Sequence, residues 1–191
     1  AGAASRPRLG YVLPGGEGEL LAPAPEQPMA KGLLAAFAEH SEAWVEVRLS
    51  STECCNSAGP SVLFDPRTAY FGTGEQSAEE PPWIEVRLRE CEVCPAAFGL
   101  KHGSDTGDVC RDFVVEAGSD DGDEWAEVLA RGGKALSLVG GVFHVPRQSD
   151  VFFCRFRIRM TGPNSSKRWQ LMVAWFDVFG SFRARSLPGP P

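Results

Sequence analysis

The chain has 191 residues, of which 43% are hydrophobic, so it can bury a core and does not belong to the disordered class. Its 19 basic and 25 acidic residues give a formal net charge of −6, which argues against a protein that binds nucleic acid through a basic face. No apolar run approaches the roughly 20 residues that a membrane-spanning helix needs. The sequence predicts one domain with tails, or at most two small domains, without nucleic-acid binding or membrane insertion.

Alanine, glycine and proline dominate the first 30 residues, which predicts an extended tail. Within 29–40, Leu33, Leu34 and Phe37 recur at helical spacing and predict a short helix. We therefore expect a tail with a short helix over 1–40, a folded domain over 41–182 and a second tail over 183–191.

Short stretches of alternating apolar and polar residues, separated by glycine-rich turns, fill the middle of the chain. Two of them share the pattern Trp-(Val or Ile)-Glu-Val-Arg-Leu, which we interpret as one period-two solution reached twice and not as a repeat. Strand and helix patterns do not alternate, so the sequence favours an all-β sandwich or barrel. Strands are expected at 43–50, 82–90, 96–103, 111–119, 124–131, 142–146, 151–160 and 171–182.

The acidic stretch Glu-Ala-Gly-Ser-Asp-Asp-Gly-Asp-Glu-Trp, 116–125, has two interpretations. A calcium loop with Gly122 at its sixth position would have alanine at the first position and valine at the twelfth, where ligands are required. Aspartate and glycine instead favour a tight turn between strands. We predict a hairpin followed by a buried Trp125, with a metal site as the alternative.

The six cysteines also leave alternatives open. An even number permits disulfides in a secreted protein, although a chain of this size does not need them. Cys91 and Cys94 have the spacing of zinc ligands, but Cys54 and Cys55 are adjacent and make a poor second pair. Cys154 lies in a strand-like stretch, where a thiol acts as a small apolar side chain. We expect reduced thiols, buried or idle, and an intracellular, cytoplasmic protein.

Three arginines, Arg155, Arg157 and Arg159, alternate with apolar residues and share one face of a predicted strand. The first interpretation is a solvated face paired with acids on a neighbouring strand. The alternative is a small cationic patch for an acidic partner.

Catalytic signatures are absent from the sequence: it has no G-x-S-x-G elbow, H-E-x-x-H pair or Walker loop. The histidines, His40, His102 and His144, are scattered. We expect a protein that is not an enzyme.

Five segments, in chain order, resemble a discoidin or coagulation-factor type-C domain of the galactose-binding-like superfamily. They are SS…GPSVLFDPRTAYFGTGEQSAEEPPWIEVRL, FGLKHGSD, RDFVVEAGSDDGDEWAEVL, FRIRMTGPNSS and WFDVFGSF. The resemblance covers about 41–182 and is to the intracellular branch, found beside BTB, kelch and HECT modules and related to the DOC fold of a ubiquitin-ligase subunit. Secreted members join the two ends of the domain by a disulfide, which has no counterpart here because no cysteine follows Cys154.

The resemblance implies an eight-stranded jelly-roll β-sandwich with chain ends near one another, to which the residue patterns above add a short N-terminal helix and extended tails. It implies no enzyme, and it places ligand binding in loops at one end of the sandwich. Aromatic and arginine side chains dominate binding hot spots, so we expect exposed contacts there. The alternative for Tyr70 and Phe71 is that they fill the core. The expected ligand-binding residues are Tyr70, Phe71, His102, Asp105, Arg168 and Trp169.

The function expected from the sequence is a non-enzymatic recognition module that binds a protein partner through these loops. It would act within a larger intracellular assembly, of the ubiquitin-ligase or cytoskeletal type. The alternative is a carbohydrate-binding module. No cofactor is expected, although a structural calcium held by Asp65, Asp105 and Asp108 stays as an alternative.

Overall fold

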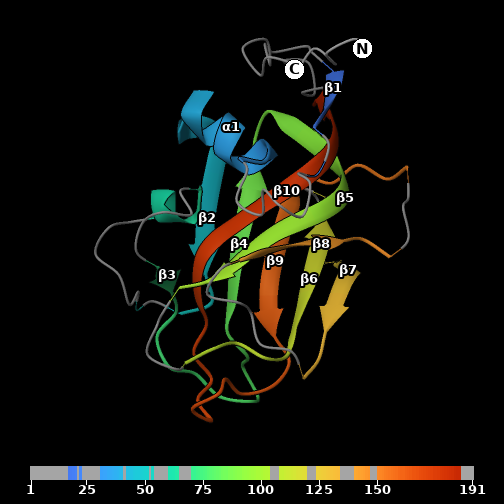
Figure 1. Cartoon of the computed structure of the whole chain (residues 1–191). Coiled ribbons are helices and arrows are strands. Elements are labelled where there is room, and N and C mark those ends of the chain that lie inside the picture. Colours follow the sequence, from blue (N-terminus) through green and yellow to red (C-terminus); the bar gives the residue numbers. More distant parts are fainter. Residues whose placement is uncertain are drawn as a thin grey trace, which may run out of the picture.

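The computed structural model describes residues 17–20, 22, 31–40, 42–51, 53, 60–64, 70–103, 108–119, 124–133, 140–146 and 150–185. They form two antiparallel β-sheets packed face to face, with a short helix at one end of the sandwich (Figure 1). This arrangement confirms the all-β sandwich with a short N-terminal helix.

Each sheet contains five strands. The first sheet has the order β1-β10-β5-β8, with β3 also paired to β10, and contains β1 (Glu17–Leu20), β3 (Phe71–Gly72), β5 (Cys91–His102), β8 (Gly141–His144) and β10 (Met172–Ala184). The second sheet has the order β2-β4-β9-β6-β7 and contains β2 (Val45–Leu49), β4 (Trp83–Leu88), β6 (Phe113–Gly118), β7 (Ala126–Arg131) and β9 (Arg155–Met160). The helix α1 (Leu33–His40) and the 3₁₀ turns Glu42–Trp44 and Pro60–Phe64 complete the described elements.

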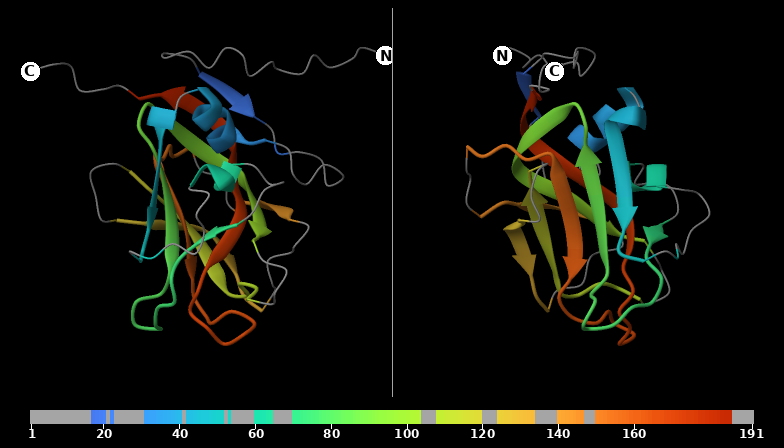
Figure 2. Two further views of the ribbon diagram at one scale, coloured as in Figure 1. Left: turned by 90° about the vertical axis from the view of Figure 1, so that its left-hand side faces the viewer. Right: turned by 180° about the vertical axis from the view of Figure 1, so that it is seen from behind.

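All eight strands expected from the alternation are present, and β1 and β3 bring the described strands to ten. The strand β1 lies in the stretch expected to be an extended tail. It pairs with β10 from Glu17 opposite Arg183 to Leu20 opposite Gly180, and this pairing brings the first and last described strands together (Figure 2). With four and two residues, β1 and β3 are too short to show a period-two pattern of their own.

The two similar stretches of β2 and β4 pair with each other. Val47 lies opposite Val86, and the antiparallel direction then sets Glu46 opposite Arg87 and Arg48 opposite Glu85. Any Glu-Val-Arg motif paired in this way with a second copy places each acid opposite a base. The shared pattern is therefore a strand pairing, which agrees with the interpretation that it is not a repeat.

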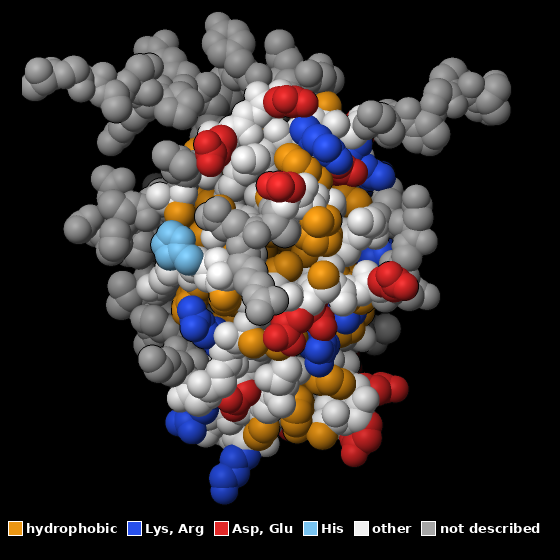
Figure 3. Space-filling view, turned by 90° about the vertical axis from the view of Figure 1, so that its right-hand side faces the viewer, with side chains coloured by type: hydrophobic (Ala, Val, Ile, Leu, Met, Phe, Trp, Pro, Cys, Tyr) orange, Lys and Arg blue, Asp and Glu red, His pale blue; other side chains and the backbone are white. Residues whose placement is uncertain are grey.

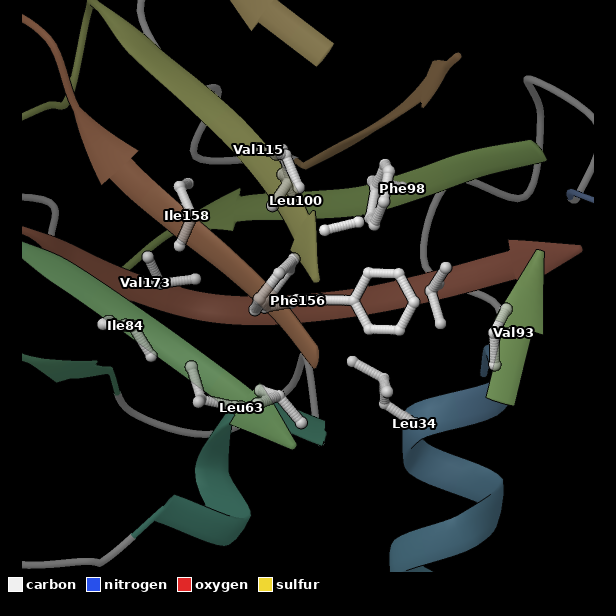
Figure 4. Close-up of a cluster of buried hydrophobic side chains, with 14 of the residues drawn as sticks. Leu34, Leu63, Ile84, Val93, Phe98, Leu100, Val115, Phe156, Ile158 and Val173 are labelled. Carbon is white, nitrogen blue, oxygen red and sulfur yellow. The ribbon is translucent and has the colours of Figure 1, made fainter. Parts of the chain in front are cut away.

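Apolar side chains from both sheets and from α1 fill the space between the sheets (Figure 4). Phe98 from the first sheet and Phe156 from the second have ring centroids 5.9 Å apart and are fully buried. The helix contributes Leu33, Leu34 and Phe37, none of which is more than 1% exposed. Burial of such side chains stabilises the fold by about 2 kcal/mol each, so α1 belongs to the core of the sandwich.

Asp177 of β10 holds the start of α1. Its carboxylate is fully buried and accepts hydrogen bonds from the backbone N–H groups of Gly32 (2.7 Å), Leu34 (2.8 Å) and Val178 (2.9 Å). The first N–H groups of a helix have no partner within the helix. Asp177 supplies the missing acceptors from a residue far along the chain, and it thereby ties the helix to β10.

The acidic stretch connects two paired strands, as a hairpin requires. Ala117 of β6 lies opposite Ala126 of β7, while 120–123 lie outside the described residues. The expectation that Trp125 enters the core is wrong. Trp125 precedes β7, so the alternation of that strand does not fix its side, and its half-buried ring lies 4.3 Å and 4.1 Å from the guanidinium carbons of Arg155 and Arg157.

Those arginines are paired with acids of their own sheet, as the first interpretation predicts. Arg155 lies 3.1 Å from Glu85, and Arg157 and Arg159 lie 2.6 Å and 2.7 Å from Glu116. Burial acts to raise the pKa of Glu116, but the hydrogen bonds from Arg159 and Arg157 outweigh it and hold the pKa below its usual range. The alternative of a free cationic patch has no support in this arrangement.

We expect Glu116→Gln to lower the free energy of unfolding at pH 7 by about 2 kcal/mol, less than for a fully enclosed ion pair because Arg159 is 28% exposed. The folded state holds the pKa of Glu116 below its unfolded value, so its contribution is present above that value and is lost as pH falls through the folded pKa. Urea unfolding at pH 7 and pH 3 measures this. The exposed Glu75→Gln, away from this cluster, is the control, and equal losses for both variants at pH 7 would contradict the prediction.

The four described cysteines, Cys91, Cys94, Cys110 and Cys154, form no disulfide. Cys91 and Cys94 are three residues apart on β5, so their side chains lie on opposite faces, one buried and one partly exposed, and cannot bind one zinc ion. Burial raises the pKa of Cys91 to about 11 and that of Cys110 to about 12, so both stay protonated. Cys154 is buried in the core as expected, and Cys54 and Cys55 lie outside the described residues.

Within the described ranges, no group of three histidine, cysteine or acidic side chains is placed to hold a metal ion. Asp65 and Asp105, two of the three calcium ligands considered above, lie outside those ranges. The described part of the chain also has no helix long and apolar enough to cross a membrane.

Candidate functional site

Three loops gather at the end of the sandwich opposite β1 (Figures 1 and 2). They follow β3, β5 and β9 and cover 73–82, 103–112 and 161–171, of which 104–107 lie outside the described residues. We call them the end loops. Loops carried on a rigid sandwich are where binding residues are usually found.

Asn164 organises the loop between β9 and β10. Its side-chain oxygen accepts hydrogen bonds from the backbone N–H groups of Ser166 (3.0 Å) and Arg168 (2.9 Å), and its amide donates to the carbonyl of Gln170 (3.3 Å). Lys167 takes a positive φ of 64°, which lets the chain turn back so that the Asn164 N–H donates to the carbonyl of Arg168. Asn164 is only 3% exposed, so this loop has its own small polar core.

Backbone hydrogen bonds tie this loop to the other two. Ser165 and Val109 exchange two bonds of 2.9 Å, one through the serine hydroxyl and one through the backbone. The Gln76 N–H donates to the carbonyl of Trp169 at 2.8 Å, and the Gln170 amide donates to the carbonyl of Thr73 at 3.2 Å. The described end loops therefore form one preorganised surface, which lowers the entropy lost when a ligand binds.

An open charge pair lies at the centre of this surface. Arg168 extends its guanidinium to 3.8 Å from Asp108 Oδ1, which is longer than a hydrogen bond. Within the described residues, that oxygen accepts no hydrogen bond. The arginine side chain is 49% exposed and the aspartate side chain 10%. The exposed guanidinium thus keeps donor capacity that a polar ligand can use, whereas Asp108 Oδ1 is enclosed and acts on the guanidinium by its charge.

His102 lies beneath this pair and not on the surface. It is 1% exposed, so the expectation that it is an exposed contact is wrong. The alternation of β5 gives the reason, because Leu100 and His102 are two residues apart and point to the same, buried side. Burial lowers the pKa of His102, against the opposing effects of the Met172 backbone and the Asp108 charge. A neutral imidazole therefore supports the surface from below.

The two aromatic residues before the first end loop, Tyr70 and Phe71, differ in exposure and in what they contact. Phe71 is 5% exposed and packs in the core. The prediction that it is an exposed contact is therefore wrong, and the alternative prediction that it fills the core is correct. Tyr70 is half-buried and packs on Gly103, where an added Cβ would come within 2.0 Å of the Tyr70 Cβ. Gly103 follows His102 directly, so Tyr70 borders the surface on the side of β5.

Trp169 is partly buried, with one side against the core, while Arg168 is exposed as expected. Asp105 lies outside the described residues. The structure thus brings Tyr70, Arg168 and Trp169 to the end loops. Sequence reasoning missed the contact of Asp108 with Arg168 and the role of Asn164, because both depend on contacts between separate loops.

The comparisons with known proteins give structural matches only. No family model matches the chain, and no curated protein matches it. The module CBM32-3 from a family 31 glycoside hydrolase of Clostridium perfringens superposes with a TM-score of 0.55 at 12% identity, covering 81% of this chain and 95% of the other. The family 32 carbohydrate-binding module of NanJ from the same organism, in complex with galactose, gives 0.54 at 10% identity, covering 80% and 98%.

A fucose-binding module of Streptococcus pneumoniae gives a TM-score of 0.53 at 16% identity, covering 78% of this chain and 95% of the other. At such identities these likenesses define the fold alone. The chain has the β-sandwich fold of these carbohydrate-binding modules. These matches support the general resemblance to type-C domains, not the intracellular branch that the sequence resembles.

Proposed function

We propose that the chain is a non-catalytic carbohydrate-binding module that binds a glycan at the end loops. The observation that carries the proposal is the open pair of Arg168 and Asp108, separated by 3.8 Å on a surface bordered by Tyr70 and Trp169. A sugar hydroxyl can accept a hydrogen bond from the exposed guanidinium, while the enclosed Asp108 carboxylate holds that guanidinium in place by its charge. Charge-assisted hydrogen bonds of this kind are the stronger ones.

Two further facts support a glycan. The end loops are tied together by hydrogen bonds, which suits a small rigid ligand better than a segment that must fold on binding. The structural neighbours include modules solved with sugars. The protein partner that the sequence first suggested has no comparable observation among the described end-loop residues.

We expect Arg168→Ala to weaken glycan binding at least tenfold, because it removes a charged hydrogen-bond donor worth roughly 1.5–3 kcal/mol. Binding to a glycan array identifies the sugar, and calorimetry with that sugar measures the affinity. The neighbouring Lys167→Asn is the matched control: it removes a charge from the same loop, and asparagine tolerates the positive φ of this position. Absence of any sugar binding by the unaltered protein, or equal losses in both variants, would refute the proposal.

A further inference from the structure

A second recessed surface lies at the other end of the sandwich, beside β1. It is a groove of about 560 Å³ lined by Glu17, Gly18, Glu19, Phe152, Ser181, Phe182 and Arg183. Its lining comes from β1, from the paired residues of β10 and from Phe152. Figure 3 shows acidic side chains close to basic ones at the upper part of one face of the molecule. The groove is separate from the end loops, so a ligand bound here would not compete with a ligand there.

The basic group of the groove is already neutralised. Arg183 makes hydrogen bonds of 2.8 Å and 3.0 Å with Glu92, and its guanidinium carbon lies 4.1 Å from the centre of the Phe152 ring. Glu17 and Glu19 are exposed, and no described residue forms an ion pair or hydrogen bond with either carboxylate. Among the described residues, Arg183 lies between Glu92 and its cross-strand neighbour Glu17, so with Glu19 the three acids and one base give this region a net charge of −2 next to the Phe152 ring.

The backbone of β1 adds a second recognition element. Among the described strands, β1 ends its sheet, and its pairing with β10 uses only one of its two edges. A free strand edge is a template for another extended chain, which binds through backbone hydrogen bonds. Glu17 and Glu19 are two residues apart and share one face of β1, so their side chains leave the strand about 7 Å from each other.

We propose that the β1 groove binds an extended, basic segment of a partner protein, with lysine or arginine at alternate positions. The segment adds as a strand to β1, and its basic side chains lie opposite Glu17 and Glu19. Charge complementarity selects this occupant: a second copy of β1 would set glutamates against glutamates, which is unfavourable. The site would let the module hold a protein at one end while the end loops stay free.

A fluorescent ten-residue peptide with lysine at alternate positions, separated by valine, tests this on the full chain by anisotropy. We expect saturable binding that weakens at least tenfold in the double variant Glu17→Lys, Glu19→Lys. The matched control is Glu79→Lys, Glu80→Lys, which makes the same change of net charge at an exposed bend away from the groove and should leave the affinity within twofold. Methylation of alternate backbone nitrogens of the peptide should abolish binding, because strand addition needs those donors.

The outcomes separate strand addition from general charge attraction. No binding of the alternating peptide overturns the proposal, as does equal weakening in the two double variants. A peptide of the same composition with its lysines contiguous should bind at least tenfold more weakly, and equal affinity would overturn the proposal as well. Glycan binding should be unchanged in the Glu17→Lys, Glu19→Lys variant, so the result is independent of the function proposed for the end loops.

Discussion

Asp177→Asn is expected to lower the free energy of unfolding by about 3 kcal/mol near pH 5. Both carboxylate oxygens of Asp177 accept hydrogen bonds from backbone N–H groups, at 2.7 Å, 2.8 Å and 2.9 Å, in a site with no exposure. Near pH 5 the carboxyl carries a proton, but its hydroxyl oxygen can still accept a hydrogen bond. The amide nitrogen of asparagine cannot accept one, and it would face an N–H group that water cannot reach. The start of α1 then loses its anchor on β10. Urea unfolding followed by tryptophan fluorescence measures the loss, and the exposed Asp150→Asn should change stability by less than about 0.5 kcal/mol.

The pH dependence of this difference distinguishes Asp177 from an ordinary surface acid. Burial raises its pKa to about 7, against the hydrogen bonds of Gly32 and Val178, which lower it. The folded state therefore keeps a proton that the unfolded state releases near pH 4. The stability contributed by this group is fully present below that value and is lost as pH rises through about 7. The difference between the unaltered protein and Asp177→Asn should shrink from pH 5 to pH 8, and a difference that stays constant over this range would show that the carboxylate is ionised throughout.

Asn164→Ala is expected to lower the free energy of unfolding by about 2 kcal/mol and to weaken glycan binding about a hundredfold. The side chain makes three hydrogen bonds within the loop, two of them to the N–H groups of Ser166 and Arg168. Without them the loop no longer holds Arg168 and Trp169 in one geometry, so the effect on binding exceeds that of removing Arg168 alone. Calorimetry with the glycan and thermal unfolding measure the two quantities.

Asn164→Asp serves as the graded control for that variant. Aspartate keeps the acceptor for both N–H groups and loses only the donation to the Gln170 carbonyl, the longest of the three bonds at 3.3 Å. We expect an affinity between those of the unaltered protein and Asn164→Ala. Unchanged glycan binding by the alanine variant would show that the loop does not depend on Asn164.

The strands could be predicted from the sequence because each sheet of the sandwich buries only one of its faces. Apolar and polar residues therefore alternate along each strand, and this alternation can be recognised within a short stretch of sequence. The burial of β9 alternates residue by residue, as its sequence does. The same rule applied to β5 would have placed His102 inside with Phe98 and Leu100, since all three lie on one face. The resemblance instead placed His102 in a binding loop, and the predicted exposure is wrong because β5 includes His102 as its last residue.

Other features could not be predicted because they depend on pairing between distant segments. β1 has no strand pattern of its own and is a strand only because β10 pairs with it. Trp125 lies outside the core because Arg155 and Arg157 of another strand offer it a surface. Arg168 and Asp108 come from loops that follow different strands, and no local spacing relates them.

The central position of β10 has a consequence for the kinetics of folding. β10 pairs with β1, β3 and β5, and its Asp177 fixes α1, so one late strand joins segments from the whole length of the described chain. Closing such long loops costs entropy before their contacts form, and proteins dominated by non-local strand pairing fold in milliseconds to seconds. During synthesis the first sheet lacks its central strand until β10 leaves the ribosome. Before that, β5 and α1 lack the packing that β10 supplies, and this is the interval in which the nascent chain is most exposed to aggregation.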